Sequence, residues 1–352
     1  MFADSILLDY PAKGITDFCG SDDEALETFG QQLNQEAVLE SWLLNLNELD
    51  FFYIENCIIE STWLDDLEKM ALFAEKIFEV SLIRQNIVEL LLKIISDVCK
   101  VEPEFFKVIV KEALRLPADN MFLAYKIISS NPESVKKIVT GYISDQAFIW
   151  FAPELEESNE SAFNRKLLSM ISRGADDPVI KKFVEDIELL RQDDWLLYKQ
   201  QRDRGINPNP FAVALRYDDI ETFQVLVSRD GGCFSNHFDQ RIEVSPFERC
   251  DFINHNPTWI QFAAFFGATT CFKFLLVNGA NLRLNDDFNE SDSQRLEGRS
   301  VTELAVAGGQ TEIIRLCYGK LEDLSGCDEI AEMFKQDAVA EWISLIRDSS
   351  CK

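Results

Sequence analysis

The stretch Thr258–Asn281, TWIQFAAFFGATTCFKFLLVNGAN, decides the fold. Its apolar side chains recur at helical spacing in both halves, at Ile260, Ala263, Ala264, Phe272, Leu275 and Leu276. Gly267 suits a turn between two helices, and Gly279 suits a helix end. Two helices this short cannot bury their own apolar faces. The stretch therefore predicts neighbouring copies of the same unit.

Other parts of the chain repeat this unit. NPFAVALRYDDIETFQVLV covers residues 209–227, SVTELAVAGGQTEIIRLCY covers 300–318, and a last helix pair is expected over 329–346. The alignment places Ala214, Ala263 and Ala305 where each first helix presses on its neighbour. The alanines are 49 and 42 residues apart, so the units are separated by long loops, 231–255 and 282–298.

These segments resemble ankyrin repeats, whose regular period is about 33 residues. The wider stretch of residues 200–320 is similar to divergent ankyrin proteins abundant in parabasalid protists, which carry a helical N-terminal region of unknown function. The resemblance implies repeats at about 206–230, 256–281 and 298–318, with a cap at 328–347. It also implies that the two long loops are fingers, and the polar run 285–298 is expected to be a flexible insert.

The first two hundred residues predict helices without a clear period. We expect an acidic, loosely ordered lead-in over 1–34 and a helical solenoid region over 35–205, followed by the repeats of 206–352. Helices are expected at Gln35–Leu49, from a cap at Ser61–Thr62, around Ile87–Val98, from Pro103, at Met121–Ile128, from Pro132, at Ala162–Ile171 and from Pro178. Because strand signals are nearly absent, the predicted fold is all-α, a right-handed α-solenoid of helix pairs.

Charge and cysteine content narrow the possible partners and compartment. The 352 residues carry a net charge of −27, from 61 acidic and 34 basic side chains, and both halves are acidic. This disfavours nucleic acid and anionic membranes as partners. Nine cysteines without a CxxC pair indicate a reducing compartment, so we expect an intracellular, cytoplasmic protein. The start MFADSILLDY is no signal peptide, and the apolar run 147–152 is too short for membrane insertion.

Motifs for catalysis are missing, and we expect a non-enzymatic protein without a cofactor. The sequence has two histidines, His237 and His255, and neither has a nucleophile motif around it; no phosphate loop or dinucleotide fingerprint occurs either. The alternative is an enzyme with an unrecognised site in the helical N-terminal half. It requires converging charged groups in a pocket among residues 35–200.

Two groups of residues raise the possibility of a metal. Cys233, His237, Cys250 and His255 fall within 23 residues and are zinc-ligand types, but their spacing fits no zinc finger, so a loop without metal is favoured. The acidic pairs Asp218–Asp219 and Asp286–Asp287 suggest calcium or acid catalysis, and solvated turns are the favoured interpretation.

A partner-binding surface follows from the ankyrin resemblance. The residues just before each turn face solvent in that family, and the corresponding residues here are Arg216, Tyr217, Phe265 and Phe266, with Gln261 and Glu303 one turn earlier and His255 and Asn256 near the finger. Exposed aromatic residues would be strong anchors for another protein. The alternative for the two phenylalanines is that they pack inward. The resemblance thus predicts a scaffold, or an adaptor whose two halves bind different proteins.

Overall fold

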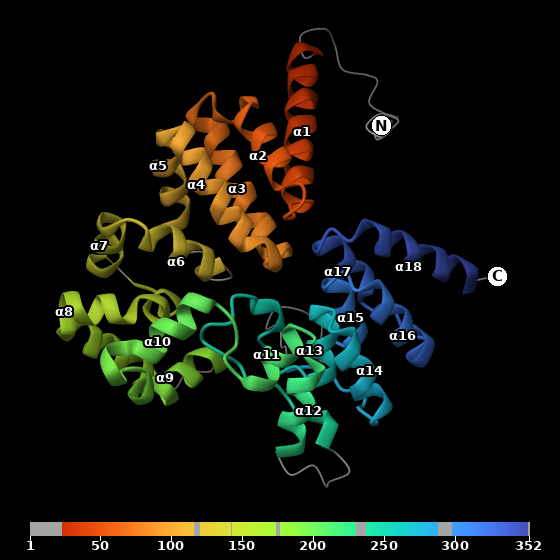
Figure 1. Cartoon of the computed structure of the whole chain (residues 1–352). Coiled ribbons are helices and arrows are strands. Elements are labelled where there is room, and N and C mark those ends of the chain that lie inside the picture. Colours follow the sequence, from red (N-terminus) through yellow and green to blue (C-terminus); the bar gives the residue numbers. More distant parts are fainter. Residues whose placement is uncertain are drawn as a thin grey trace. The chain divides into compact units, whose positions relative to one another are not determined.

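Helices form nearly all the regular structure of the protein in a computed structural model that describes residues 23–115, 120–141, 143–173, 177–229, 237–287 and 298–350 (Figure 1). In these ranges the extended pairing is limited to an isolated bridge between Arg241 and Thr258. The all-α prediction is therefore confirmed. None of the helices in the described ranges has the length and apolar content needed to cross a bilayer.

The chain divides into two compact units, residues 1–45 and 46–352. The first contains helix α1, Asp23–Leu44. Of the lead-in predicted over 1–34, residues 1–22 lie outside the described part, and 23–34 are already helical, so the loosely ordered segment does not extend to residue 34. The boundary predicted at 205/206 falls inside the second unit.

The first half of the second unit consists of α2 Phe51–Ile59, α3 Leu67–Ile83, α4 Val88–Val101, α5 Pro103–Ala113, α6 Met121–Ser129, α7 Pro132–Thr140, α8 Asp145–Arg173, α9 Pro178–Leu190 and α10 Gln192–Arg204. Pro103, Pro132 and Pro178 each begin a helix, as predicted, because the missing N–H is not needed there. The residue before each proline caps the helix with its side chain.

Several local predictions in this half are wrong. Asp66, rather than Ser61–Thr62, caps α3, because its carboxylate accepts two backbone N–H groups of the first turn. Helix α8 leaves helical geometry at Phe151 and again at Asn159, whose side chain accepts the Ala162 N–H, so the predicted helix Ala162–Ile171 forms its last part. The stretch of α8 before Asn159, which includes Pro153, was not predicted. Helices α2 and α10 were not predicted.

The second half contains four helix pairs: α11 Pro210–Arg216 with α12 Ile220–Arg229, α13 Trp259–Phe266 with α14 Thr269–Val277, α15 Val301–Ala307 with α16 Thr311–Leu321, and α17 Cys327–Met333 with α18 Asp337–Ser350. The first helices contact one another in chain order, α11 with α13, α13 with α15 and α15 with α17. Helix α14 likewise contacts α12 and α16. These contacts enclose one apolar core, and Figure 1 shows the successive pairs side by side.

The four pairs share one turn. At each turn a backbone N–H, from Asp219, Ala268, Gln310 and Gln336, donates to the carbonyl of a buried alanine five residues earlier, Ala214, Ala263, Ala305 and Ala331, at 2.8–3.0 Å. The residue before each donor is left-handed: Asp218, Gly267, Gly309 and Lys335. This is the hydrogen-bond pattern of a helix ended by a left-handed residue. The predicted role of the alanines as close-packing positions agrees with their burial.

The segment between α12 and α13 packs onto the N-terminal helices. Phe247 is buried between the rings of Trp150 and Tyr198, with centroids 6.0 and 4.9 Å away. Next to it, the Arg249 N–H donates to the Gly205 carbonyl at 3.2 Å. In its described part, 237–255, this segment is therefore a connection between the two halves rather than a free finger. Of the insert predicted to be flexible, residues 288–297 lie outside the described part.

Two glycines allow a direct test of the close packing at the turns. A Cβ at Gly308 would overlap the Phe265 carbonyl oxygen, whereas one at Gly319, inside α16, would meet nothing. We expect Gly308→Ala to lower the free energy of unfolding by about 2 kcal/mol, and Gly319→Ala to raise it by roughly 0.5–1 kcal/mol. Urea unfolding of both variants measures this. Equal effects of the two changes would contradict the packing described here.

A second test concerns Asp218, which joins two helix pairs. Its carboxylate accepts the backbone N–H groups of Thr270 and Cys271, at 3.0 and 2.8 Å. Burial raises its pKa, but these hydrogen bonds outweigh that effect and the net pKa is lowered. The resulting stabilisation is present above the unfolded-state pKa of about 3.9 and is lost as the pH falls through the folded-state pKa.

Asp218→Asn should therefore lose about 1 kcal/mol of stability at neutral pH, and the difference from the original protein should shrink in acid. Asp193→Asn is the matched control, because Asp193 is exposed and has a similar left-handed backbone. Unfolding measured from pH 3 to pH 7 is the required experiment. A constant difference over this range would show that the Asp218 charge is not involved.

Candidate functional site

Gln261 and Glu303 were predicted to face a partner, but both are buried. Each is the third residue of its helix and folds back to accept the backbone N–H of the cap, Thr258 or Ser300, at 2.7 Å. The cap side chains accept in return from the backbone N–H of Gln261 and Glu303. Gln261 also donates to the carbonyls of Leu284 and Arg299. Their expected exposure is therefore wrong, because both side chains are used to begin a helix.

Phe265 and Phe266, which precede the turn between α13 and α14, differ in how deeply they are buried. Phe265 is 7% exposed and lies beside Phe252, with ring centroids 6.1 Å apart. Phe266 is half-buried, and the guanidinium of Arg216 lies 3.9 Å from its ring centroid. Of the two alternatives, inward packing describes Phe265, while Phe266 keeps part of its surface accessible.

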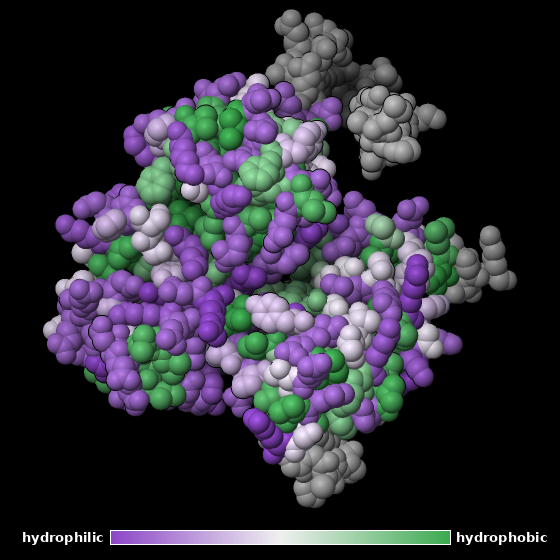
Figure 2. All heavy atoms as spheres, in the orientation of Figure 1, coloured by the Kyte–Doolittle hydropathy of each residue, from purple (hydrophilic) through white to green (hydrophobic). Residues whose placement is uncertain are grey.

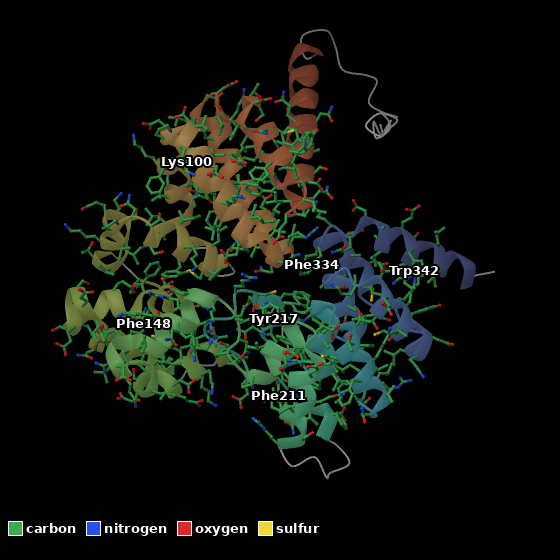
Figure 3. The ribbon with its side chains drawn as sticks, viewed as in Figure 1. Lys100, Phe148, Phe211, Tyr217, Phe334 and Trp342 are labelled. Atoms are coloured by element: carbon green, nitrogen blue, oxygen red, sulfur yellow. The ribbon has the colours of Figure 1, made fainter. Side chains whose placement is uncertain are left out.

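The side chains of Arg216 and Tyr217 differ even more in their exposure to solvent. The Arg216 side chain is buried in an ion pair with Glu248, whose carboxylate also accepts the backbone N–H groups of Asn207 and Cys250. Arg216 is thus used inside the protein. Tyr217 is 68% exposed, and of the predicted set it is the large apolar side chain that remains open to solvent (Figure 3).

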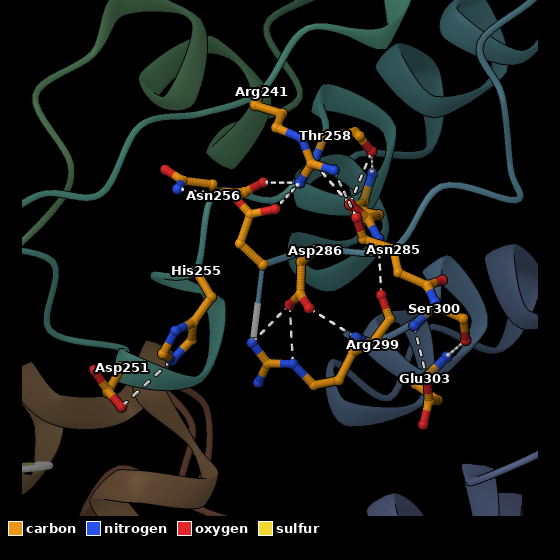
Figure 4. A network of polar contacts seen from close by, with 12 residues as sticks. Arg241, Asp251, His255, Asn256, Thr258, Asn285, Asp286, Arg299, Ser300 and Glu303 are labelled. Atoms are coloured by element: carbon orange, nitrogen blue, oxygen red, sulfur yellow. Dashed lines mark hydrogen bonds and ion pairs between the residues drawn. The ribbon is translucent and has the colours of Figure 1, made fainter. Parts of the chain in front are cut away.

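His255 and Asn256 lie where the loop returns to α13 (Figure 4). Asn256 is left-handed; its side chain donates to Asp287 and accepts the Val244 N–H. Its carbonyl accepts a hydrogen bond from Arg241. The His255 Nε2 atom is 3.8 Å from an Asp251 carboxylate oxygen. This pair of predicted residues therefore helps to hold the two loops together.

One aspartate of each acidic pair is held by donors inside the protein. Asp286 is buried, and its two oxygens accept the Arg299 backbone N–H at 2.7 Å and the guanidinium Nε and Nη2 at 2.9 and 2.7 Å. Arg299 is equally buried and lies 4.0 Å from the Phe252 ring centroid. The Asp218 carboxylate accepts two backbone N–H groups of α14, which belongs to the next helix pair. The interpretation as solvated turns is therefore wrong for Asp218 and Asp286, because internal donors take the oxygens that a calcium ion would need, whereas Asp219 and Asp287 are exposed.

The zinc alternative gains no geometric support. Cys233 and the side chain of His237 lie outside the described part. Cys250 is buried in the core, and burial raises the pKa of its thiol to about 12, which disfavours the thiolate that zinc requires. No cluster of three potential metal-ligating side chains occurs among the residues with described side chains.

Two of the cavities in the described part of the chain lie between the N-terminal helices and the second half. The first, which we call the turn pocket, has a volume of about 350 Å³ and is lined by residues including Arg84, Gln85, Asn86, Phe266, Gln310 and Gln336. The second, the arginine pocket, has a volume of about 220 Å³ and is lined by residues including Phe122, Gln146, Trp150, Asp177, Arg249 and Asp251. His255 also lines the arginine pocket, and Phe265 the turn pocket.

Arg249, Glu248 and Asp251 of the arginine pocket were not predicted as functional residues. They lie in the loop 231–255, which the ankyrin resemblance predicts to be a finger. The signal available in the sequence was the presence of Phe247 and Ile253 in that stretch, because large apolar residues in a loop indicate that it packs against something. Both are 1% exposed.

Comparisons with protein-family models, curated proteins and solved structures found no match to this chain.

The buried pair Asp286–Arg299 makes a testable contribution to stability. Arg299→Met leaves the Asp286 carboxylate buried without its cation, and we expect a loss of about 3 kcal/mol in the free energy of unfolding. The control is Lys273→Ala, which removes an exposed ion pair with Glu312 and should cost less than about 1 kcal/mol. Denaturant unfolding of both variants measures the difference. Similar losses would contradict the special role of the buried pair.

Proposed function

We propose that the protein is a non-enzymatic scaffold or adaptor for protein–protein interaction, whose last third is a divergent ankyrin-repeat stack. The observation that supports this most is the identical turn in four successive helix pairs, together with the contacts between their first helices. Repeated units of this kind stack through their neighbours and expose one continuous side to partners. In the same proposal the preceding helices form a right-handed α-solenoid, which supplies a second surface.

The partners in this proposal are other proteins, without nucleic acid, membrane insertion or a cofactor. The net charge of −27 supports it, because phosphate backbones and anionic lipids are repelled by such a surface. Figure 2 shows that hydrophilic residues cover much of one face of the molecule. An intracellular, cytoplasmic location is part of the proposal, supported by six free cysteines in the described part of the chain.

The proposed contact surface is the side of the turns, with Tyr217 as its anchor. Tyr217 follows Arg216, and Arg216 lies on the Phe266 ring, which in turn lines the turn pocket. Arg216, Phe265, Gln261 and Glu303 support this surface from within instead of touching a partner. An exposed aromatic side chain is a common interface anchor.

The test is quantitative affinity capture with the full chain. Tyr217→Ala should reduce the recovery of captured proteins at least tenfold, because truncation of an anchor costs about 2 kcal/mol or more of binding energy. Val277→Ala is the matched control, since Val277 is 85% exposed on α14, away from the turns. Equal recovery with the two variants would contradict the proposed surface.

A stability measurement separates this surface from the core. Phe265→Ala should lower the free energy of unfolding by about 3 kcal/mol, as expected for a buried phenylalanine. Tyr217→Ala should change it by less than about 0.5 kcal/mol. If Tyr217→Ala destabilised the protein as much as Phe265→Ala, its effect on capture would reflect folding, and the proposal would lose its anchor.

A further inference from the structure

The arginine pocket has a polar lining built from both halves of the second unit. Met121 and Phe122 of α6, Gln146 and Trp150 of α8 and the start of α9 form one side. Pro246, Arg249 and Asp251 of the segment before α13 form the other. The pocket has a volume of about 220 Å³. This is somewhat below the roughly 300–1,000 Å³ of pockets for drug-sized ligands, so it suits a smaller molecule.

Arg249 is the cation of this pocket, and among the described residues its guanidinium has no ion-pair or hydrogen-bond partner. Its guanidinium lies 5.5 Å from the Phe122 ring centroid, and its backbone N–H is fixed by the Gly205 carbonyl. The Nε atom is buried and makes no hydrogen bond in the described part of the chain. Burial and the nearby Arg216 lower the Arg249 pKa, which Glu248 and Glu89 offset only in part. A desolvated cation in this situation favours an anionic ligand.

The carboxylates around Arg249 are mostly engaged elsewhere. Glu248 is bound by Arg216 and two backbone N–H groups. Asp177 accepts the N–H groups of Val179 and Ile180 at the start of α9, and its other oxygen is 3.4 Å from the Gln146 amide. Asp251 differs from them, because its side chain is 56% exposed and His255 is its ion-pair neighbour at 3.8 Å. The pocket thus contains a cation whose Nε has no hydrogen-bond partner among the described residues and an acid that is largely open to solvent.

We propose that the arginine pocket binds a small α-amino acid as a zwitterion. The ligand carboxylate pairs with the planar guanidinium of Arg249, and the ligand ammonium group with Asp251. The side chain of the ligand lies along Met121, Trp150 and Val179. A phosphate is disfavoured, because Asp251 would repel a dianion, whereas it pairs with the ammonium group of an amino acid. This site is separate from the surface of the turns and does not depend on the proposed scaffold function.

The experiment is isothermal titration of the full chain with glycine, L-serine, L-leucine and L-phenylalanine. Two derivatives of the tightest binder are titrated in the same way. The N-acetyl derivative lacks the ammonium group, and the amide lacks the carboxylate. We expect the free amino acid to bind at least tenfold more tightly than either derivative. Absence of binding by all four amino acids would overturn the proposal. N-acetyl and free forms of equal affinity would overturn the assignment of the ammonium group to Asp251.

Variants locate the binding. Arg249→Met should weaken binding of the amino acid at least tenfold. Asp251→Asn should weaken binding of the free amino acid but leave binding of its N-acetyl form unchanged. Arg165→Met is the control, since Arg165 is an exposed arginine on α8 and the change in charge is the same. If Arg249→Met fails to fold, Val179→Trp fills the pocket and leaves its charges unchanged. A folded Val179→Trp or Arg249→Met variant that binds like the original protein would overturn the proposal.

Discussion

The structure of the last third depends on a hydrogen bond that recurs in each helix pair. The backbone N–H of the residue after the left-handed turn residue donates to the carbonyl of a buried alanine. The first helices have only seven or eight residues, so the chain must reverse at once and still satisfy the end of the helix. The alanine also lets neighbouring first helices approach closely, because a larger side chain would separate them. Asp218 and Lys335 take the left-handed position in place of glycine in the first and last pairs, and the Asp218 turn is held by the N–H groups of Thr270 and Cys271 from the next pair.

Buried polar groups determine where the long loops return to this frame. Arg216 with Glu248 and Asp286 with Arg299 close two loops of different length at fixed points. A buried ion pair adds little net stability, because desolvation of the charges offsets their attraction. Its larger effect is selective, since any other register of the loop would leave one charge buried and alone. Because the loops return at fixed points, the number of residues between successive helix pairs can vary while the same helices stay in contact. The turn alanines are 49 residues apart in one case and 42 in the next.

Local patterns in the sequence were enough to predict the helix type, the three proline starts and three of the four alanines of the turns, Ala331 being the exception. They were not enough for pairs such as Arg216 and Glu248, because 32 residues separate the partners and neither is unusual in its own segment. The candidate surface was predicted from family resemblance, which placed Gln261 and Glu303 outside. The spacings Thr258 to Gln261 and Ser300 to Glu303 are those of a capping box, so their burial had a signal that the prediction did not use.

The segment before α13 explains why the chain does not divide at residue 205. Three consecutive side chains have three destinations: Phe247 enters the aromatic cluster of α8 and α10, Glu248 binds Arg216 of the first helix pair, and Arg249 lies on Phe122 of α6. Because these contacts share one short backbone, separating the halves would break all of them together. Polar and aromatic contacts of this kind make a connection cooperative, since each keeps the others in register. The change from irregular helices to repeated pairs is therefore a change of pattern within one compact unit.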